Sequence, residues 1–193
     1  MLVFDRAHVV GSRDQAGLAD VRIESALSAI IDLEDSVACV DGEDKVNAYS
    51  TWLGLMKGDL TSEFEKNGEK VVRCLNSDLS FISPSGDDFS IRARALLWIR
   101  NVGHLMTTPA VLDSNGDEIF EGLLDAMVTT MLGLHDLKKA DGNSRHGSIY
   151  IVKPKMHGPA EVDFADKIFS KVESSLGIEP VSYTHLTLPT KVY

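Results

Sequence analysis

Charged side chains stand directly after each of three short apolar segments in this sequence, and they are the side chains best suited to chemistry. In chain order they are Glu34, Asp35, Arg100, Lys153 and Lys155. Short apolar segments rich in β-branched residues are typical of buried parallel strands. Because ligands bind at the carboxyl ends of the strands in barrels and in doubly wound sheets, we expect the five side chains to converge there.

Arg100 is the first candidate for contact with an anionic ligand. A guanidinium group at the end of an apolar strand is costly to bury alone, so it must pair with a carboxylate or reach a ligand. Its planar fork of donors matches a carboxylate, and it can stabilise a developing oxyanion. A structural ion pair with Glu34 or Asp35 explains the sequence equally well, and both interpretations stay open at this point.

Glu34 and Asp35 are adjacent, and adjacent side chains on a strand point to opposite faces. We therefore expect one of them to face the ligand-binding end and the other to pair with its surroundings. Two carboxylates could serve a hard cation, an acid–base step or the positioning of an arginine. A strand-end salt bridge is the simpler alternative.

A stiff basic loop, Lys-Pro-Lys-Met-His-Gly-Pro, begins at Lys153. Lys153, Lys155 and His157 would suit the binding of a phosphate or a carboxylate, or the lysines are simply solvated. The six histidines show no zinc-type spacing, and the sequence contains neither a Walker loop nor a GxGxxG motif. Nucleotide binding through those motifs is therefore unsupported.

Helical periodicity alternates with the three apolar segments. The segments are residues 29–33, 96–99 and 148–152, and the helical patterns cover residues 44–56, 122–137 and 160–176. Asp41 and Asp44 are candidate caps for the first helix. Strands that alternate with helices predict a parallel α/β architecture, and the pattern favours a barrel slightly over a doubly wound sheet.

The remaining segments differ in composition from these elements. Residues 58–95 are rich in polar residues, with a short strand at 71–75 and a turn at 83–87, which predicts an insertion between two barrel elements. Residues 1–22 have the composition of a loop. Residues 181–193 show no helical period and resemble translated adapter read-through more than protein, with a C-terminal extension as the alternative.

The bulk composition excludes some classes of partner. The 193 residues are 44% apolar and carry a net charge of −10, which repels nucleic acid and anionic membranes. Cys39 and Cys74 form no CxxC motif and indicate buried thiols in a reducing compartment. No secretory segment or apolar run long enough to cross a bilayer is present, so we expect a cytoplasmic protein.

Several of these stretches together resemble malate synthases of the G type. They are the runs 31–38, 41–46, 73–76, 99–107 and 148–159, in the same order as in that family. Arg-Asn-Val-Gly-His-Leu-Met and Val-Lys-Pro-Lys-Met-His-Gly-Pro are the most specific of them. The resemblance implies a (β/α)₈ TIM barrel with an inserted α/β domain: residues 1–57 and 96–180 would be barrel segments, and residues 58–95 part of the insertion.

The resemblance also implies an activity and roles for individual residues. Malate synthases condense acetyl-CoA with glyoxylate in a Claisen-type reaction of the glyoxylate bypass and hydrolyse the product to malate and CoA, with Mg²⁺ holding glyoxylate. By the matched motifs, Arg100 would contact glyoxylate and stabilise the developing negative oxygen. Ser36 and Arg73 would contact acetyl-CoA, and the acidic pair Glu34 and Asp35 would support the magnesium-bound water and the arginine. The parent enzyme would be a monomer.

Some parts of the family pattern are expected outside this chain. The family's magnesium-ligating carboxylates and its catalytic aspartate lie downstream of the matched region, so we expect no metal ligand here. The family's N-terminal portion, which helps bind CoA, is also missing, so we expect Met1 to be an internal methionine. An incomplete barrel has open sheet edges, so the isolated chain is expected to be inactive and poorly soluble. Two alternatives stay open. One is a truncated, non-catalytic CoA-binding product; the other is a related barrel lyase of another acyl-CoA, against which the Arg-Asn-Val-Gly-His run argues.

Overall fold

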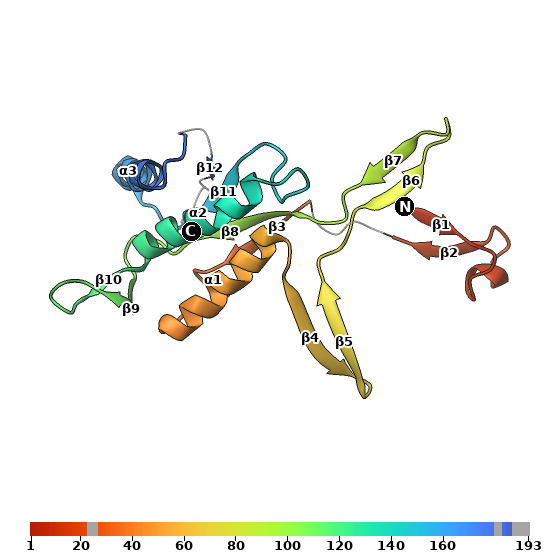
Figure 1. Ribbon diagram of the computed structural model, residues 1–193, viewed down its shortest axis with the longest axis horizontal. Coiled ribbons are helices and arrows are strands. Elements are labelled where there is room, and N and C mark those ends of the chain that lie inside the picture. The colour runs from red at the N-terminus through yellow and green to blue at the C-terminus, as the bar shows by residue number, and fades with distance from the viewer. Residues whose placement is uncertain (23–26, 180–182, 187–193) are drawn as a thin grey trace.

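A four-stranded parallel sheet forms the centre of the protein (Figure 1). The computed structural model describes residues 1–22, 27–179 and 183–186. The strands of the sheet, in the spatial order β12-β11-β8-β3, are β3 (Ser28–Asp32), β8 (Leu96–Arg100), β11 (Ile149–Val152) and β12 (Tyr183–Leu186). The three strands predicted from the apolar segments are confirmed. Within the described ranges the sheet is open, so these residues do not close the expected barrel by themselves.

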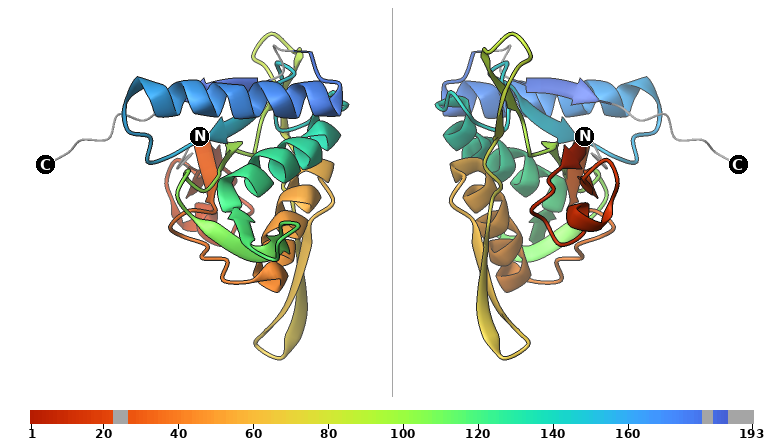
Figure 2. Two further views of the ribbon diagram at one scale, coloured as in Figure 1. Left: turned by 90° about the vertical axis from the view of Figure 1, so that its left-hand side faces the viewer. Right: turned by 90° about the vertical axis from the view of Figure 1, so that its right-hand side faces the viewer.

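Within the described residues, three long helices connect and cover the strands, as the periodicity predicts. They are α1 (Gly42–Lys57), α2 (Glu121–Leu137) and α3 (Gly158–Leu176). α2 lies between α1 and α3 (Figure 2). Asp41 is the N-cap of α1, because its carboxylate accepts the backbone N–H of Asp44 at 3.0 Å. Asp44 does not cap the helix; its own carboxylate accepts the N–H of Val40.

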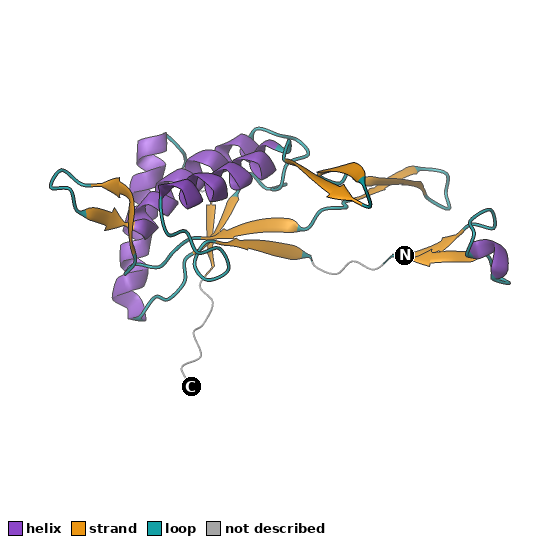
Figure 3. Ribbon diagram, turned by 90° about the horizontal axis from the view of Figure 1, so that it is seen from below, coloured by secondary structure: helices purple, strands orange, loops and turns teal. Residues whose placement is uncertain are grey.

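The helices cover one face of the sheet and leave the other face half-exposed (Figure 3). Ile99 pairs in register with Ile31 and Ile151, and this row belongs to the core that contains Trp52 of α1. The alternate row carries Ile30, Trp98 and Tyr150, which are exposed or half-exposed, and the last two rings stack with centroids 6.2 Å apart. The alternation along each strand therefore gives the sheet a second apolar face, which none of the described helices covers.

Four two-stranded antiparallel hairpins complete the described residues. They are β1 (Leu2–Phe4) with β2 (Leu18–Val21), β4 (Thr61–Lys66) with β5 (Glu69–Cys74), β6 (Leu79–Ile82) with β7 (Asp88–Ile91), and β9 (Thr107–Leu112) with β10 (Glu118–Phe120). The β4–β5 and β6–β7 hairpins project from the end of the sheet where the parallel strands begin (Figure 1). The predicted strand at 71–75 and the predicted turn at 83–87 are confirmed.

The loop predicted for residues 1–22 is wrong, because this segment forms the β1–β2 hairpin around a short 3₁₀ helix, η1 (Gly11–Arg13). Strands of three and four residues are too short to show a clear alternation of polar and apolar residues. Of residues 181–193, the structure describes only the backbone of β12, which runs parallel to β11; the rest of the proposed read-through segment lies outside the described residues.

Candidate active site

Five charged side chains meet at the carboxyl ends of β3, β8 and β11, and we call them the strand-end cluster: Asp32, Glu34, Asp35, Arg100 and Lys155. Arg100 Nη1 lies 3.2 Å from Asp32 Oδ2, and Nη2 lies 2.9 Å from Asp35 Oδ2. Lys155 Nζ lies 2.5 Å from Glu34 Oε1 and 3.1 Å from Asp35 Oδ1. Asp35 therefore bridges the two cations, and four of the five side chains expected at the strand ends are in mutual contact.

Asp32 is the member of the cluster that sequence reasoning missed. Its carboxylate accepts the backbone N–H groups of Glu34 at 2.9 Å and Asp35 at 3.2 Å, and the Ser36 hydroxyl at 3.1 Å. Burial alone would raise the pKa of Asp32, but these hydrogen bonds and the charge of Arg100 lower it below its usual value. An aspartate followed by a turn is a known local pattern, and it was the signal available in the sequence.

Glu34 and Asp35 do not point to opposite faces of a strand, so that prediction is wrong. β3 ends at Asp32, and the two residues lie in the turn that the Asp32 carboxylate holds. The Glu34 side chain is only 3% exposed, and its Oε2 accepts the backbone N–H of Gly103 at 2.7 Å. Both carboxylates contact Lys155, whereas the arginine pairs with Asp35 and Asp32.

The lysines of the basic loop are not simply solvated. Lys155 belongs to the strand-end cluster, with a backbone φ of 54°, which is uncommon for a residue other than glycine. Lys153 turns inward, is 6% exposed, and donates to the carbonyl oxygens of Val102 at 2.5 Å and Gly103 at 3.2 Å. His157 lies apart from both lysines, before α3, where it faces Glu161.

A second network, buried except for the half-buried Tyr49, anchors the segment that follows Arg100. Lys45 Nζ lies 2.8 Å from Asp125 Oδ1 and 2.5 Å from Glu121 Oε1, and the Tyr49 hydroxyl donates to Asp125 Oδ1 at 2.7 Å. The other oxygen of Asp125 accepts the N–H of Val102 at 2.8 Å. Burial would lower the pKa of Lys45, but Asp125 and then Glu121 raise it above the usual value. The loop after β8 is thereby tied to α1 and α2.

Ser36 and Arg73 lie in different surroundings. Ser36 is hydrogen-bonded to Asp32 and so borders the strand-end cluster. Arg73 lies on β5 with its guanidinium 4.7 Å from the Phe64 ring centroid. The next residue, Cys74, lines a cavity together with Ala29 and Ala95 at the amino ends of β3 and β8. Arg73 is therefore near the end of the strands that lies opposite Arg100.

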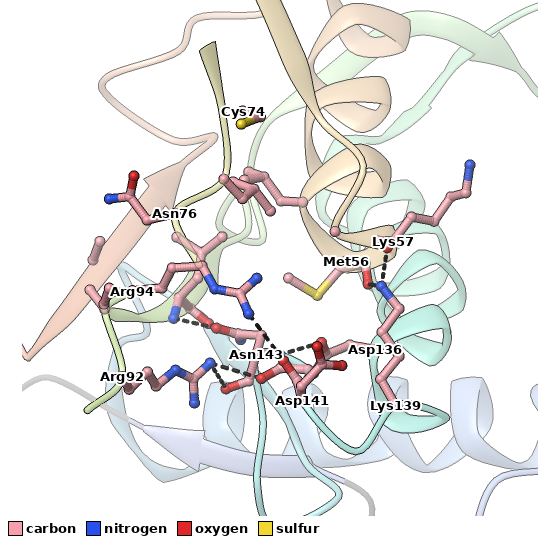
Figure 4. Close-up of a pocket in the computed structure, with 18 residues that line it drawn as sticks. Met56, Lys57, Cys74, Asn76, Arg92, Arg94, Asp136, Lys139, Asp141 and Asn143 are labelled. Atoms are coloured by element: carbon pink, nitrogen blue, oxygen red, sulfur yellow. Dashed lines mark hydrogen bonds between the residues drawn. The ribbon is translucent and has the colours of Figure 1, made fainter. Parts of the chain in front are cut away.

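That cavity has a volume of about 680 Å³, and the polar side chains that line it hold neighbouring loops together (Figure 4). Arg92 donates to the carbonyl oxygens of Gly142 and Asn143, and Arg94 donates to that of Asp141. These arginines hold the loop that leads to β11. The candidate active site is instead the strand-end cluster, because carboxylates and cations from three strands converge there.

The described residues supply no complete metal site. No group of three His, Cys, Asp or Glu side chains in residues 1–22 and 27–179 could hold a metal ion. The carboxylates of the strand-end cluster already face Arg100, Lys155 and backbone N–H groups. They do not fit a magnesium ion by themselves. In the same part of the chain, no helix is long and apolar enough to cross a membrane.

Gly122, the second residue of α2, is required by the packing around Lys153. A Cβ at this position would lie 2.4 Å from Lys153 Nζ and 2.5 Å from the Gly103 carbonyl oxygen. We expect Gly122→Ala to lower the free energy of unfolding by about 1–3 kcal/mol, measured by urea denaturation. Gly42→Ala, at the first turn of α1, is the matched control: its Cβ would meet only ordinary contacts at 3.6 Å, so its effect should stay within about 1 kcal/mol. Equal losses in the two variants would contradict the packing argument.

A family model of malate synthases and two curated malate synthases match this chain. Residues 96–187 match the family model "Malate synthase, TIM barrel domain". The malate synthase G of Halalkalibacterium halodurans is 50% identical over 177 residues, which cover 91% of this chain and 24% of that protein. The malate synthase G of Corynebacterium glutamicum is 47% identical over 179 residues, which cover 92% of this chain and 24% of that protein. The chain thus spans about a quarter of the length of these curated relatives.

Proposed function

Because this chain is similar to malate synthase G over about nine-tenths of its length, we propose that it provides the glyoxylate-binding arginine of a malate synthase. Such an enzyme condenses acetyl-CoA with glyoxylate and hydrolyses the product to malate and CoA. The observation that carries the proposal is the placement of Arg100 at the strand ends, 25% exposed and oriented by two carboxylates.

Arg100 is suited to an anionic substrate by its geometry. Asp32 and Asp35 each accept from one terminal nitrogen, which fixes the plane of the guanidinium without covering it. A guanidinium has five N–H donors, so donors remain for a carboxylate or for an oxygen that becomes negative during the reaction. A preorganised donor needs little reorientation as charge develops, and this is the contribution we assign to Arg100. Magnesium, which the resemblance implies, would need carboxylates other than those of the strand-end cluster.

The half-exposed face of the sheet supports a partial barrel. Ile30, Trp98 and Tyr150 lie on the face opposite the helices. In a (β/α)₈ barrel that face is the packed interior, lined by bulky side chains from alternate strands. We therefore assign residues 1–57 and 96–180 to a barrel, and residues 58–95, with the β4–β5 and β6–β7 hairpins, to an inserted domain.

The resemblance is the basis on which we assign Ser36 and Arg73 to acetyl-CoA; in the structure Ser36 borders the strand-end cluster, whereas Arg73 lies near the opposite end of the strands. Arg73→Ala should raise the KM for acetyl-CoA about tenfold or more with little change in kcat, since it removes one charge-assisted hydrogen bond to the ligand. Lys70→Ala is the matched control, because Lys70 lies on the same strand and pairs with exposed Glu63. Steady-state kinetics would refute the assignment of Arg73 if both variants had the same KM.

A hybrid enzyme tests the function of this chain directly. The matched 179 residues of the Corynebacterium glutamicum malate synthase G would be replaced by those of this chain, and CoA release from acetyl-CoA and glyoxylate measured. We expect turnover within about tenfold of the Corynebacterium enzyme, since active-site contacts would be kept. A folded hybrid without turnover would refute the proposal. A preference for another acyl-CoA would favour the related-lyase alternative, and CoA binding without turnover would favour the non-catalytic one.

A further inference from the structure

The functional roles described above do not explain why the charged side chain of Lys153 is buried. We propose that Lys153 is a positioning residue whose buried ammonium group fixes the peptide segment after Arg100, and so holds the guanidinium in its orientation at the strand ends. The kinetic part of this inference rests on the proposed function. Its structural part does not, because it concerns the conformation of residues 101–103.

Four hydrogen bonds hold Val102 and Gly103, and we call this set of hydrogen bonds the clamp. The carbonyl oxygens of Val102 and Gly103 accept from Lys153 Nζ. The N–H of Gly103 donates to Glu34, and the N–H of Val102 donates to Asp125. Gly103 is therefore held at both its N–H and its carbonyl group, one side by a residue after β11 and the other by a residue after β3. Only Asn101 separates Arg100 from Val102. The hydrogen bonds to Val102 and Gly103 therefore fix the direction of the backbone next to Arg100.

The burial of Lys153 indicates that its side chain does more than fill space in the protein interior. In residues 1–22 and 27–179, no carboxylate lies within 4.0 Å of its ammonium group, although the side chain is almost fully buried. Burial lowers the pKa of Lys153 from 10.5 to about 8, and the charges of Asp125 and Glu34 offset only part of this shift. An apolar side chain would avoid this penalty but would leave two carbonyl groups without their donor.

Gly122 and several charged side chains surround the ammonium group of Lys153. Gly122 has no side chain where a Cβ would meet Nζ, so α2 can approach the lysine closely. Asp125 faces the lysine from α2, Glu34 from the turn after β3, and His104 from the loop after β8. Burial, and after it the charge of Lys153, lower the pKa of His104, so His104 interacts electrostatically with the ammonium group.

Because the pKa of Lys153 is lowered in the folded protein, the stability of the protein should depend on pH in a way that reports on Lys153. The folded-state pKa of about 8 lies below the unfolded value of 10.5, so the unfolded chain binds more protons between these values. The wild type therefore gains stability as the pH rises from about 8 toward 10.5, and Lys153→Met, which cannot titrate, lacks this gain. We expect the urea midpoint of the wild type to rise relative to that of the variant between pH 7.5 and 9.5. A constant difference would contradict the lowered pKa of the buried Lys153.

Hydrogen exchange of the hybrid enzyme tests the clamp, and the kinetics of the same hybrid test its consequence. In Lys153→Met, we expect the amides of Val102 and Gly103 to exchange at least tenfold faster, while the amide of Trp52 in α1 keeps its rate. In the hybrid, kcat should fall about 30-fold while the KM for acetyl-CoA changes less than twofold. Lys167→Met is the control, because this lysine pairs with Asp163 on the exposed face of α3 and should change neither quantity.

The outcomes separate this inference from the proposed function. If the wild-type hybrid has no turnover, the function fails, yet faster exchange at Val102 and Gly103 still supports the clamp. If the hybrid is active and Lys153→Met leaves both exchange and kcat unchanged, the inference is overturned. In case Lys153→Met does not fold, Lys153→Gln keeps one donor group without the charge: partial protection of Gly103 supports the clamp, and full protection with unchanged kcat overturns it.

Discussion

Arg100→Lys in the hybrid enzyme is expected to lower kcat by about 10²–10³-fold, the range seen when one oxyanion-stabilising donor is removed. Lysine keeps the charge but has no planar fork, so it cannot contact Asp32, Asp35 and a substrate oxygen from one fixed plane. The KM for glyoxylate should rise as well, because the same donors bind its carboxylate in our proposal. The KM for acetyl-CoA should change little, and this difference between the two substrates separates a local effect from general unfolding.

The control for Arg100→Lys is a second arginine that also pairs with an aspartate. Arg145 lies 3.8 Å from Asp78 and is largely exposed, far in the fold from the carboxyl ends of the strands. Arg145→Lys should leave kcat within twofold, since exposed ion pairs contribute little. If Arg100→Lys retains more than a tenth of the wild-type kcat while the hybrid remains folded, the arginine does not stabilise the reacting oxygen, and the proposed role is wrong.

The elements that carry the site were predictable because their patterns are local. Three apolar segments and three helical periodicities correspond to β3, β8, β11, α1, α2 and α3. The convergence of Glu34, Asp35, Arg100 and Lys155 followed from a general rule about parallel strands, and the contacts between them agree with it. Short antiparallel strands were harder to predict. β1, β2 and β10 have three or four residues, too few for an alternation to stand out from a loop.

The errors at the site arose where tertiary contacts decide the direction of a side chain. Glu34 and Asp35 were expected on a strand, but Asp32 ends β3 and turns both toward Lys155. Lys153 and Lys155 are two residues apart in one basic loop, yet one is buried against carbonyl groups and the other lies in the strand-end cluster. The difference depends on Gly122 and Glu34, which are distant in sequence, so periodicity could not reveal it.

The largest effect on stability is expected for Asp125→Ala. Asp125 is fully buried, and its carboxylate serves the ammonium of Lys45, the hydroxyl of Tyr49 and the N–H of Val102. Its removal would leave a buried cation with Glu121 alone and two buried donors without an acceptor. Breaking such a buried pair costs about 3–5 kcal/mol, so we expect a loss of that size in the free energy of unfolding. Trp52 is buried beside this network and provides the fluorescence signal for urea denaturation.

The matched control, Asp163→Ala, breaks an ion pair of similar length but different surroundings. Asp163 lies 2.6 Å from Lys167 on α3, and both side chains are exposed, so the loss should stay below about 1 kcal/mol. Asp125→Asn should fall between the two, since an amide oxygen still accepts one hydrogen bond but carries no charge for Lys45. Because Val102 lies two residues after Arg100, Asp125→Asn should also lower kcat in the hybrid enzyme. Equal stability losses for Asp125→Ala and Asp163→Ala would mean that the buried network does not anchor the segment on which Arg100 depends.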